Sequence, residues 1–204
     1  FFKQKAAYEM EKKYDEEIQV LKKILMFAPE DIELRSALST AYFNSENYDE
    51  ALNHALCVIE LDEKDPQAYC NLGSCYSAQN MVDEAVESFQ KATEIDPDYS
   101  LPHTNLGSLY ATIGRIEKAI KEFKLATTMN QSDSLAWMNL YSCYKEVGRM
   151  EDAQEAFRKY ESLMNQGSQA EEHSHIPGGV AQTGQLASGA DLDTASPGME
   201  ELTS

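Results

Sequence analysis

The chain has 204 residues, 42% of them hydrophobic, and a formal net charge of −18. So strong a negative charge repels phosphate groups and anionic lipids, which argues against nucleic acid or a membrane surface as a partner. The hydrophobic fraction is typical of a folded soluble domain, and no apolar run approaches the roughly 20 residues that span a bilayer.

Residues 1–31 are predicted to form a partial copy of the helical unit that repeats downstream, with Tyr14–Pro29 as its second helix. Residues 1–10 resemble a peptide that arises when a sequencing adaptor is translated, which would make them an artefact outside the fold. The alternative is a genuine helix, because Tyr8 lies in register with Tyr42.

Three series of residues recur every 34 positions between residues 32 and 165. They are Tyr42, Tyr76, Tyr110 and Tyr144; Leu38, Leu72, Leu106 and Leu140; and the pairs Ala51/Ala55, Ala85/Phe89, Ala119/Phe123 and Ala153/Phe157. The common register divides the chain into units at 32–65, 66–99, 100–133 and 134–165. Spacings of three and four within each series predict two amphipathic helices of about 13 residues per unit.

The units resemble the tetratricopeptide repeat, a pair of antiparallel helices with a period of 34 residues. The resemblance also rests on an aromatic (Tyr69, Trp137), on Leu72-Gly73 and Leu106-Gly107, and on a closing Pro97. It implies an all-α fold, a right-handed α-solenoid of stacked helix-turn-helix repeats. Asn80, Gly114 and Gly148 fall where the two helices of a unit join, and these residue types accept the left-handed conformation of a tight turn.

The resemblance also implies that the first helix of each unit lines a concave groove. The candidate peptide-binding residues there are Asn71, Ser74, Thr104, Asn105, Ser108, Met138, Asn139 and Ser142. An asparagine amide both donates and accepts hydrogen bonds, so a series of them suits the backbone of an extended peptide. The series is similar to the asparagine ladder in the repeat arm of O-linked N-acetylglucosamine transferases. The alternative is that these asparagines bind only water.

Two observations bear on the partner. The groove positions where related co-chaperones carry a basic clamp for a terminal carboxylate are Ser36, Cys70, Thr104 and Met138, none of them charged. Between Ser36 and Gln90 the only basic residue is Lys64, against ten acidic residues. This stretch is either a solvated acidic face or a docking surface for a basic protein partner.

The sequence contains no recognisable catalytic, cofactor-binding or metal-binding constellation, so we expect no enzymatic activity, no cofactor and no metal. The four cysteines form no Cys-x-x-Cys pair and are predicted to be free, mostly buried thiols in a reducing, cytoplasmic setting. Because the first residue is Phe1 and not Met, we expect a fragment or a processed product, with a lost signal peptide as the alternative.

Residues 166–204 contain no basic and no aromatic residue, six of the ten glycines and six acidic residues. Such a composition cannot offset the entropy cost of ordering, and we predict a disordered acidic tail. The last repeat helix, about Glu151–Met164, lacks a following helix, and uncovered Leu163 and Met164 would favour self-association.

The sequence as a whole predicts a non-catalytic scaffold that binds an extended peptide segment of a partner in the concave groove. The alternatives are a substrate-recruiting arm of a larger enzyme, such as a glycosyltransferase, and an assembly factor of a multiprotein complex.

Overall fold

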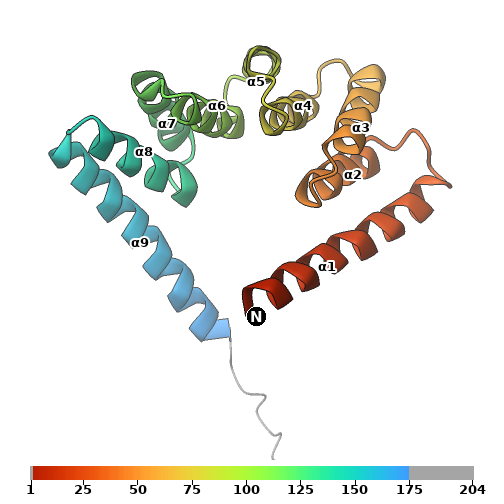
Figure 1. The fold of residues 1–204 in the computed structure, drawn as a ribbon, viewed down its shortest axis with the longest axis horizontal. Coiled ribbons are helices and arrows are strands. Elements are labelled where there is room, and N and C mark those ends of the chain that lie inside the picture. The colour runs from red at the N-terminus through yellow and green to blue at the C-terminus, as the bar shows by residue number, and fades with distance from the viewer. Residues whose placement is uncertain (1, 175–204) are drawn as a thin grey trace, which may run out of the picture.

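The computed structural model describes the backbone of residues 2–174 and, within this range, the side chains of residues 9, 10 and 12–166. The described chain forms nine α-helices and no strand, arranged as an arch (Figure 1). Their bounds are α1 (Phe2–Leu25), α2 (Ile32–Asn44), α3 (Tyr48–Leu61), α4 (Pro66–Ala78), α5 (Val82–Ile95), α6 (Ser100–Thr112), α7 (Ile116–Met129), α8 (Ser134–Glu146) and α9 (Met150–Ser174). The predicted all-α solenoid of paired helices is confirmed.

Each repeat is a hairpin of a first helix (α2, α4, α6 or α8) and a second helix (α3, α5, α7 or α9). The turn between them has one residue with positive φ, at Asn80 (60°), Gly114 (73°) and Gly148 (75°), as predicted. The equivalent residue of the first complete repeat is Glu46, with a φ of 61°, which its side chain adopts less readily than glycine or asparagine.

Short polar residues fix where the first helices begin. Asp31, Asp65 and Asp133 are N-caps whose carboxylates accept hydrogen bonds from backbone N–H groups of the first turn. At the other end of the second repeat, α5 stops at Ile95, and Asp96 is extended because Pro97 follows it.

Within each repeat the two helices approach closely at a glycine. A Cβ atom added at Gly73 would lie 2.7 Å from Cδ1 of Phe89, and one at Gly107 would lie 2.7 Å from Cδ1 of Phe123. Both phenylalanines are at most 1% exposed. The absence of a side chain on α4 and α6 therefore makes room for the rings of α5 and α7.

The arch curves toward its first helices. Adjacent first helices contact one another directly (α2 with α4, α4 with α6, α6 with α8), whereas among the described residues the second helices do not. A stack that is tight on one side and open on the other must curve, and the first helices therefore line the concave face (Figure 1).

The N-terminal end differs from the expected partial repeat. Helix α1 begins at Phe2 and runs without a break through Lys12, the position where the other repeats turn. Because residues 2–10 continue α1 and do not fold back over it, Ile24 is 46% exposed. The residues at the same repeat position in α3, α5 and α7 (Val58, Ala92 and Ala126) are fully buried.

The C-terminal end also departs from expectation. Helix α9 continues to Ser174, so residues 166–174, assigned to the tail from composition, are helical; the rest of the predicted tail lies outside the described residues. At the repeat position where α3, α5 and α7 place Leu52, Val86 and Ile120 in the core, α9 carries the exposed Gln154. Leu163 is half-buried and Met164 is 49% exposed, so the outer face of α9 mixes a polar cap with apolar residues.

The four cysteines are free, and three of them (Cys70, Cys75 and Cys143) are buried, as predicted. Burial raises the pKa of Cys70 to about 12 and that of Cys75 to about 11, because the thiolate loses its hydration. At pH 8 we expect an aromatic disulfide reagent to modify Cys57 first, and the other three thiols more slowly by at least about tenfold. Equal rates for all four thiols in the folded protein would contradict this burial pattern.

No helix in the described part of the chain is both long and apolar enough to cross a membrane.

Candidate peptide-binding groove

The candidate groove residues lie on α4, α6 and α8, one turn apart along each helix. Asn71, Asn105 and Asn139 occupy the same position in three successive first helices, and Ser74, Ser108 and Ser142 follow each of them by three residues. The three asparagines are half-buried, Ser74 and Ser108 are half-buried, and Ser142 is exposed. The structure therefore arranges them as two parallel rows across the concave face.

The two rows are joined by hydrogen bonds between repeats. The Asn105 side-chain amide donates to Ser74 Oγ at 3.3 Å and approaches Cys70 Sγ at 3.4 Å. The Asn139 amide donates to Ser108 Oγ at 3.4 Å. Each of these two asparagines thus holds its own first helix to the one before it, a role that the sequence analysis did not predict.

The serine hydroxyls are oriented by their own helices. Ser74, Ser108 and Ser142 each donate to the backbone carbonyl four residues earlier, at 2.9, 3.0 and 3.1 Å. The hydroxyl hydrogen is used within the helix, and the oxygen lone pairs point outward as acceptors. Ser74 and Ser108 accept from an asparagine in this way, while among the described residues Ser142 has no following first helix to supply one.

The first asparagine of the row lacks the contact that the other two make. Asn71 Nδ2 is buried and has no hydrogen-bond partner among the described residues. The residue at the serine position of the preceding repeat is Thr40, whose hydroxyl donates to the Ser36 carbonyl at 3.1 Å. The row therefore begins with an amide whose donor capacity is unused, a costly arrangement for a buried group.

Two other candidates have different surroundings. Thr104 is 1% exposed, and its hydroxyl donates to Asp133 Oδ2 at 2.8 Å in the loop before α8. A fully buried side chain cannot contact a peptide, so Thr104 is removed from the candidate contacts; it links the third repeat to the fourth. Met138 is half-buried on α8 and adds apolar surface beside Asn139.

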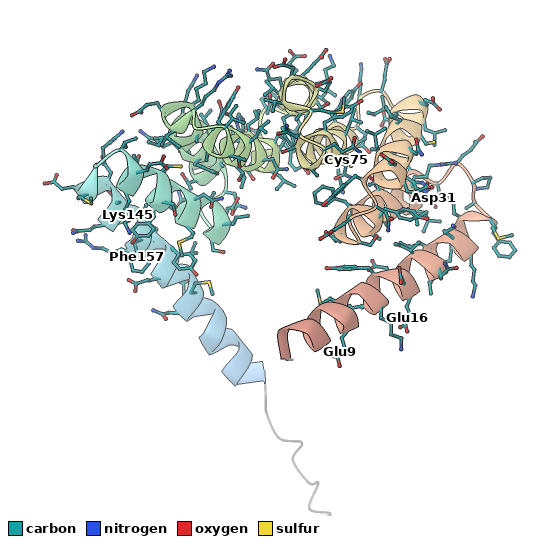
Figure 2. All side chains as sticks on the ribbon, in the orientation of Figure 1. Glu9, Glu16, Asp31, Cys75, Lys145 and Phe157 are labelled. Atoms are coloured by element: carbon teal, nitrogen blue, oxygen red, sulfur yellow. The ribbon has the colours of Figure 1, made fainter. Side chains whose placement is uncertain are left out.

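The groove offers hydrogen-bonding groups and no basic side chain at the four clamp positions. Among residues 2–174 no group of three or more His, Cys, Asp or Glu side chains is placed to hold a metal ion. Behind the groove, aromatic contacts fix the last repeat: the rings of Tyr141 on α8 and Phe157 on α9 lie 5.0 Å apart between their centroids (Figure 2). The arrangement can bind a polar chain, and its chemistry is that of recognition.

Comparison with known proteins agrees with the fold. Two family models described as tetratricopeptide repeat match residues 66–99 and residues 88–121. A crystal structure of MamA matches with a TM-score of 0.63 and 22% identity over 76% of this chain and 91% of that one. The Thermus thermophilus protein TTC0263, titled a thermophilic TPR protein, matches with a TM-score of 0.68 and 19% identity over 82% of this chain and 89% of that one. No curated protein sequence is matched.

Proposed function

We propose that this chain, a protein built of tetratricopeptide repeats, is a non-catalytic scaffold whose concave face binds an extended segment of a protein partner. The observation that carries the proposal is the row of three asparagines, repeated at one position of α4, α6 and α8 on the concave side. Their side-chain oxygens are recorded in no hydrogen bond with the described residues, and they are suited to accept from backbone N–H groups of a peptide.

The inter-repeat bonds leave the asparagines able to exchange partners. At 3.3–3.4 Å the Asn105 and Asn139 contacts are longer than the usual 2.9–3.0 Å for such bonds. A hydrogen bond of this kind contributes about 0.5–1.5 kcal/mol net, so replacing it by one to a peptide carbonyl is nearly neutral. Asn71 has an unpartnered donor, and turning its amide toward the groove loses no hydrogen bond.

The charge distribution indicates the kind of partner. A peptide with a free carboxylate would find no opposite charge in the groove, whereas the acidic surface attracts a basic segment and speeds its association at low salt. We therefore propose a neutral or basic extended segment as the ligand. The same geometry would serve a substrate-recruiting arm of an enzyme or an assembly factor, and the identity of the bound partner separates these from a free-standing scaffold.

The experiment compares two variants on a peptide array of varied sequence. The triple variant Asn71→Ala/Asn105→Ala/Asn139→Ala is expected to keep its helical circular dichroism and lose at least about tenfold in array binding, since three amide contacts of roughly 0.5–1.5 kcal/mol disappear.

The matched control is Ser74→Ala/Ser108→Ala. It removes the inter-repeat acceptors, and with them a similar amount of stability, but leaves every asparagine in place. Array binding should survive in this control. Undiminished binding by the triple alanine variant, or equal loss in the control, would show that the asparagines serve only to stack the repeats.

A further inference from the structure

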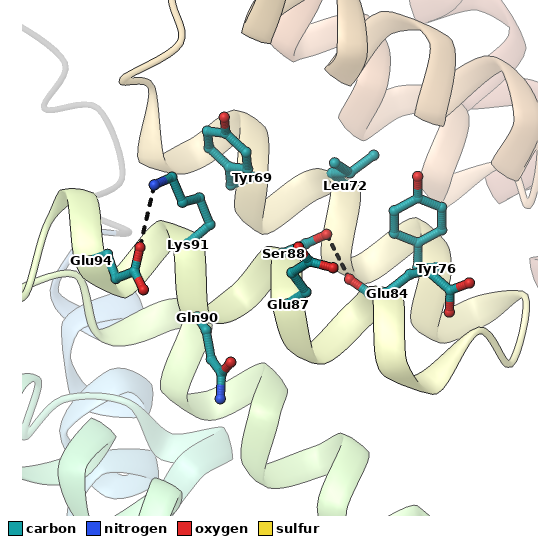
Figure 3. A pocket seen from close by; sticks show the side chains of 9 residues that line it. All are labelled: Tyr69, Leu72, Tyr76, Glu84, Glu87, Ser88, Gln90, Lys91 and Glu94. Carbon is teal, nitrogen blue, oxygen red and sulfur yellow. Dashed lines mark hydrogen bonds and ion pairs between the residues drawn. The ribbon is translucent and has the colours of Figure 1, made fainter.

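A second hollow lies on the other side of α4 from the asparagine row. At about 100° per residue, Tyr69, Leu72 and Tyr76 occupy the helix face opposite Asn71 and Ser74. Together with α5 they line a cavity of about 530 Å³ (Figure 3). The two tyrosine rings stand along one wall with Leu72 between them, so the cavity combines aromatic and aliphatic surface.

The α5 wall of this cavity is acidic. It carries Glu84, Glu87 and Glu94, and only Lys91 is basic. Lys91 is already paired with Glu94 at 3.3 Å, whereas no ion pair is recorded for Glu84 or Glu87 among the described residues. Two exposed carboxylates thus face an aromatic wall without a counter-charge.

The neighbouring repeats show what this tyrosine position accepts. Lys118 Nζ lies 5.4 Å from the ring centroid of Tyr110, and the Arg149 guanidinium carbon lies 4.6 Å from that of Tyr144. Both are cation–π contacts supplied by the chain itself. In the second repeat the residue at the Lys118 position is Glu84, and the residue at the Arg149 position is Met81.

We propose that the α4–α5 cavity binds an arginine side chain of a protein partner, with its guanidinium over Tyr76 and between Glu84 and Glu87. The guanidinium would supply from outside the cation that Lys118 and Arg149 supply within their own repeats. Its planar fork suits two carboxylates and its flat face suits an aromatic ring, while its methylene stem would lie along Leu72. This site is independent of the concave groove, and it gives the acidic surface of the second repeat a defined ligand.

The test uses the peptide acetyl-Gly-Arg-Gly-amide at constant ionic strength, with its citrulline counterpart as a neutral probe of the same shape. Tyrosine ring signals are followed by NMR, with Tyr69 and Tyr76 assigned through phenylalanine variants. We expect saturable shifts of these two rings with a dissociation constant of about 10 mM, as suits one side chain making a cation–π contact and ion pairs. The citrulline peptide should bind at least about tenfold more weakly.

Three variants make the result specific. Glu84→Gln/Glu87→Gln should weaken arginine binding about tenfold, and Glu84→Lys, which restores the charge found at Lys118, should abolish it. The matched control Glu60→Gln/Glu63→Gln removes the same charge from exposed positions outside the cavity and should bind as the parent does. Equal shifts of Tyr110 and Tyr144, equal binding of citrulline, or equal loss in the control would overturn the proposal. The asparagine variants of the groove should leave arginine binding unchanged, so the two sites fail or stand separately.

Discussion

Replacing Gly73 by leucine is expected to lower the free energy of unfolding by about 3 kcal/mol, at the upper end of the range for overpacked cores. Even the first atom of a new side chain would lie 2.7 Å from the Phe89 ring, and that ring is 1% exposed and cannot swing into solvent. The leucine must therefore push α4 away from α5. Chemical denaturation followed by circular dichroism measures the loss.

A second substitution shows whether the clash is the cause. Phe89→Leu alone should destabilise the protein by leaving space in the core, but in the Gly73→Ala background the smaller side chain should recover part of the loss. Strictly additive effects in this cycle, or an unchanged unfolding midpoint for Gly73→Leu, would mean that α4 and α5 do not meet at Gly73.

Asp133→Ala is expected to cost about 2–4 kcal/mol, more than a helix cap alone. One carboxylate oxygen caps α8 by accepting from the Ala136 N–H at 2.9 Å, and the other accepts from the Thr104 hydroxyl at 2.8 Å. Loss of the cap accounts for about 1 kcal/mol, and the Thr104 hydroxyl, 1% exposed, is then left buried without a partner at a further cost of about 1–3 kcal/mol. Thermal and denaturant unfolding report the sum.

The equivalent aspartate two repeats earlier provides the control. Asp65 caps α4 through the Gln67 and Ala68 N–H groups, and no buried threonine hydroxyl is recorded on it, so Asp65→Ala should cost only about 1 kcal/mol. In the Thr104→Val background the cost of Asp133→Ala should fall toward the same value. Equal costs for the two aspartates in the parent chain would contradict the link between repeats.

The paired helices could be predicted because they follow from local chemistry. The 34-residue register, the glycine or asparagine at the turn and the proline after α5 each act within a few residues. Glu46 shows where this stops: nothing in its side chain favours a positive φ, and its conformation is imposed by the packing of the flanking helices. Sequence alone therefore located three of the four turns by their residues and the fourth only by register.

The groove residues could be named, but their contacts could not. The bond from Asn105 to Ser74 spans two repeats, so it depends on how far and at what angle one hairpin is displaced from the next. That displacement is set by packing throughout the interface and not by the residues of the row. For the same reason the burial of Thr104 behind Asp133 could not be read from its place in the repeat.

The two ends were the least predictable parts. Lys12 occupies a turn position without a turn-forming side chain, and a run of good helix formers carries α1 through it. Beyond Met164, α9 continues through Asn165 and Gln166 to Ser174, where composition indicated a tail. In both cases helix propagation, which adds one hydrogen bond per residue, extends an element whose end the repeat pattern had placed earlier.

The side-chain amide signals of Asn71, Asn105 and Asn139 test peptide recognition by the concave face most directly. A peptide selected on the array is titrated into isotopically labelled protein, and the Nδ2 resonances are followed by NMR. We predict saturable shifts of all three, with the Tyr76 ring unmoved. Saturable binding that leaves the three amide signals in place would contradict recognition through the asparagine row.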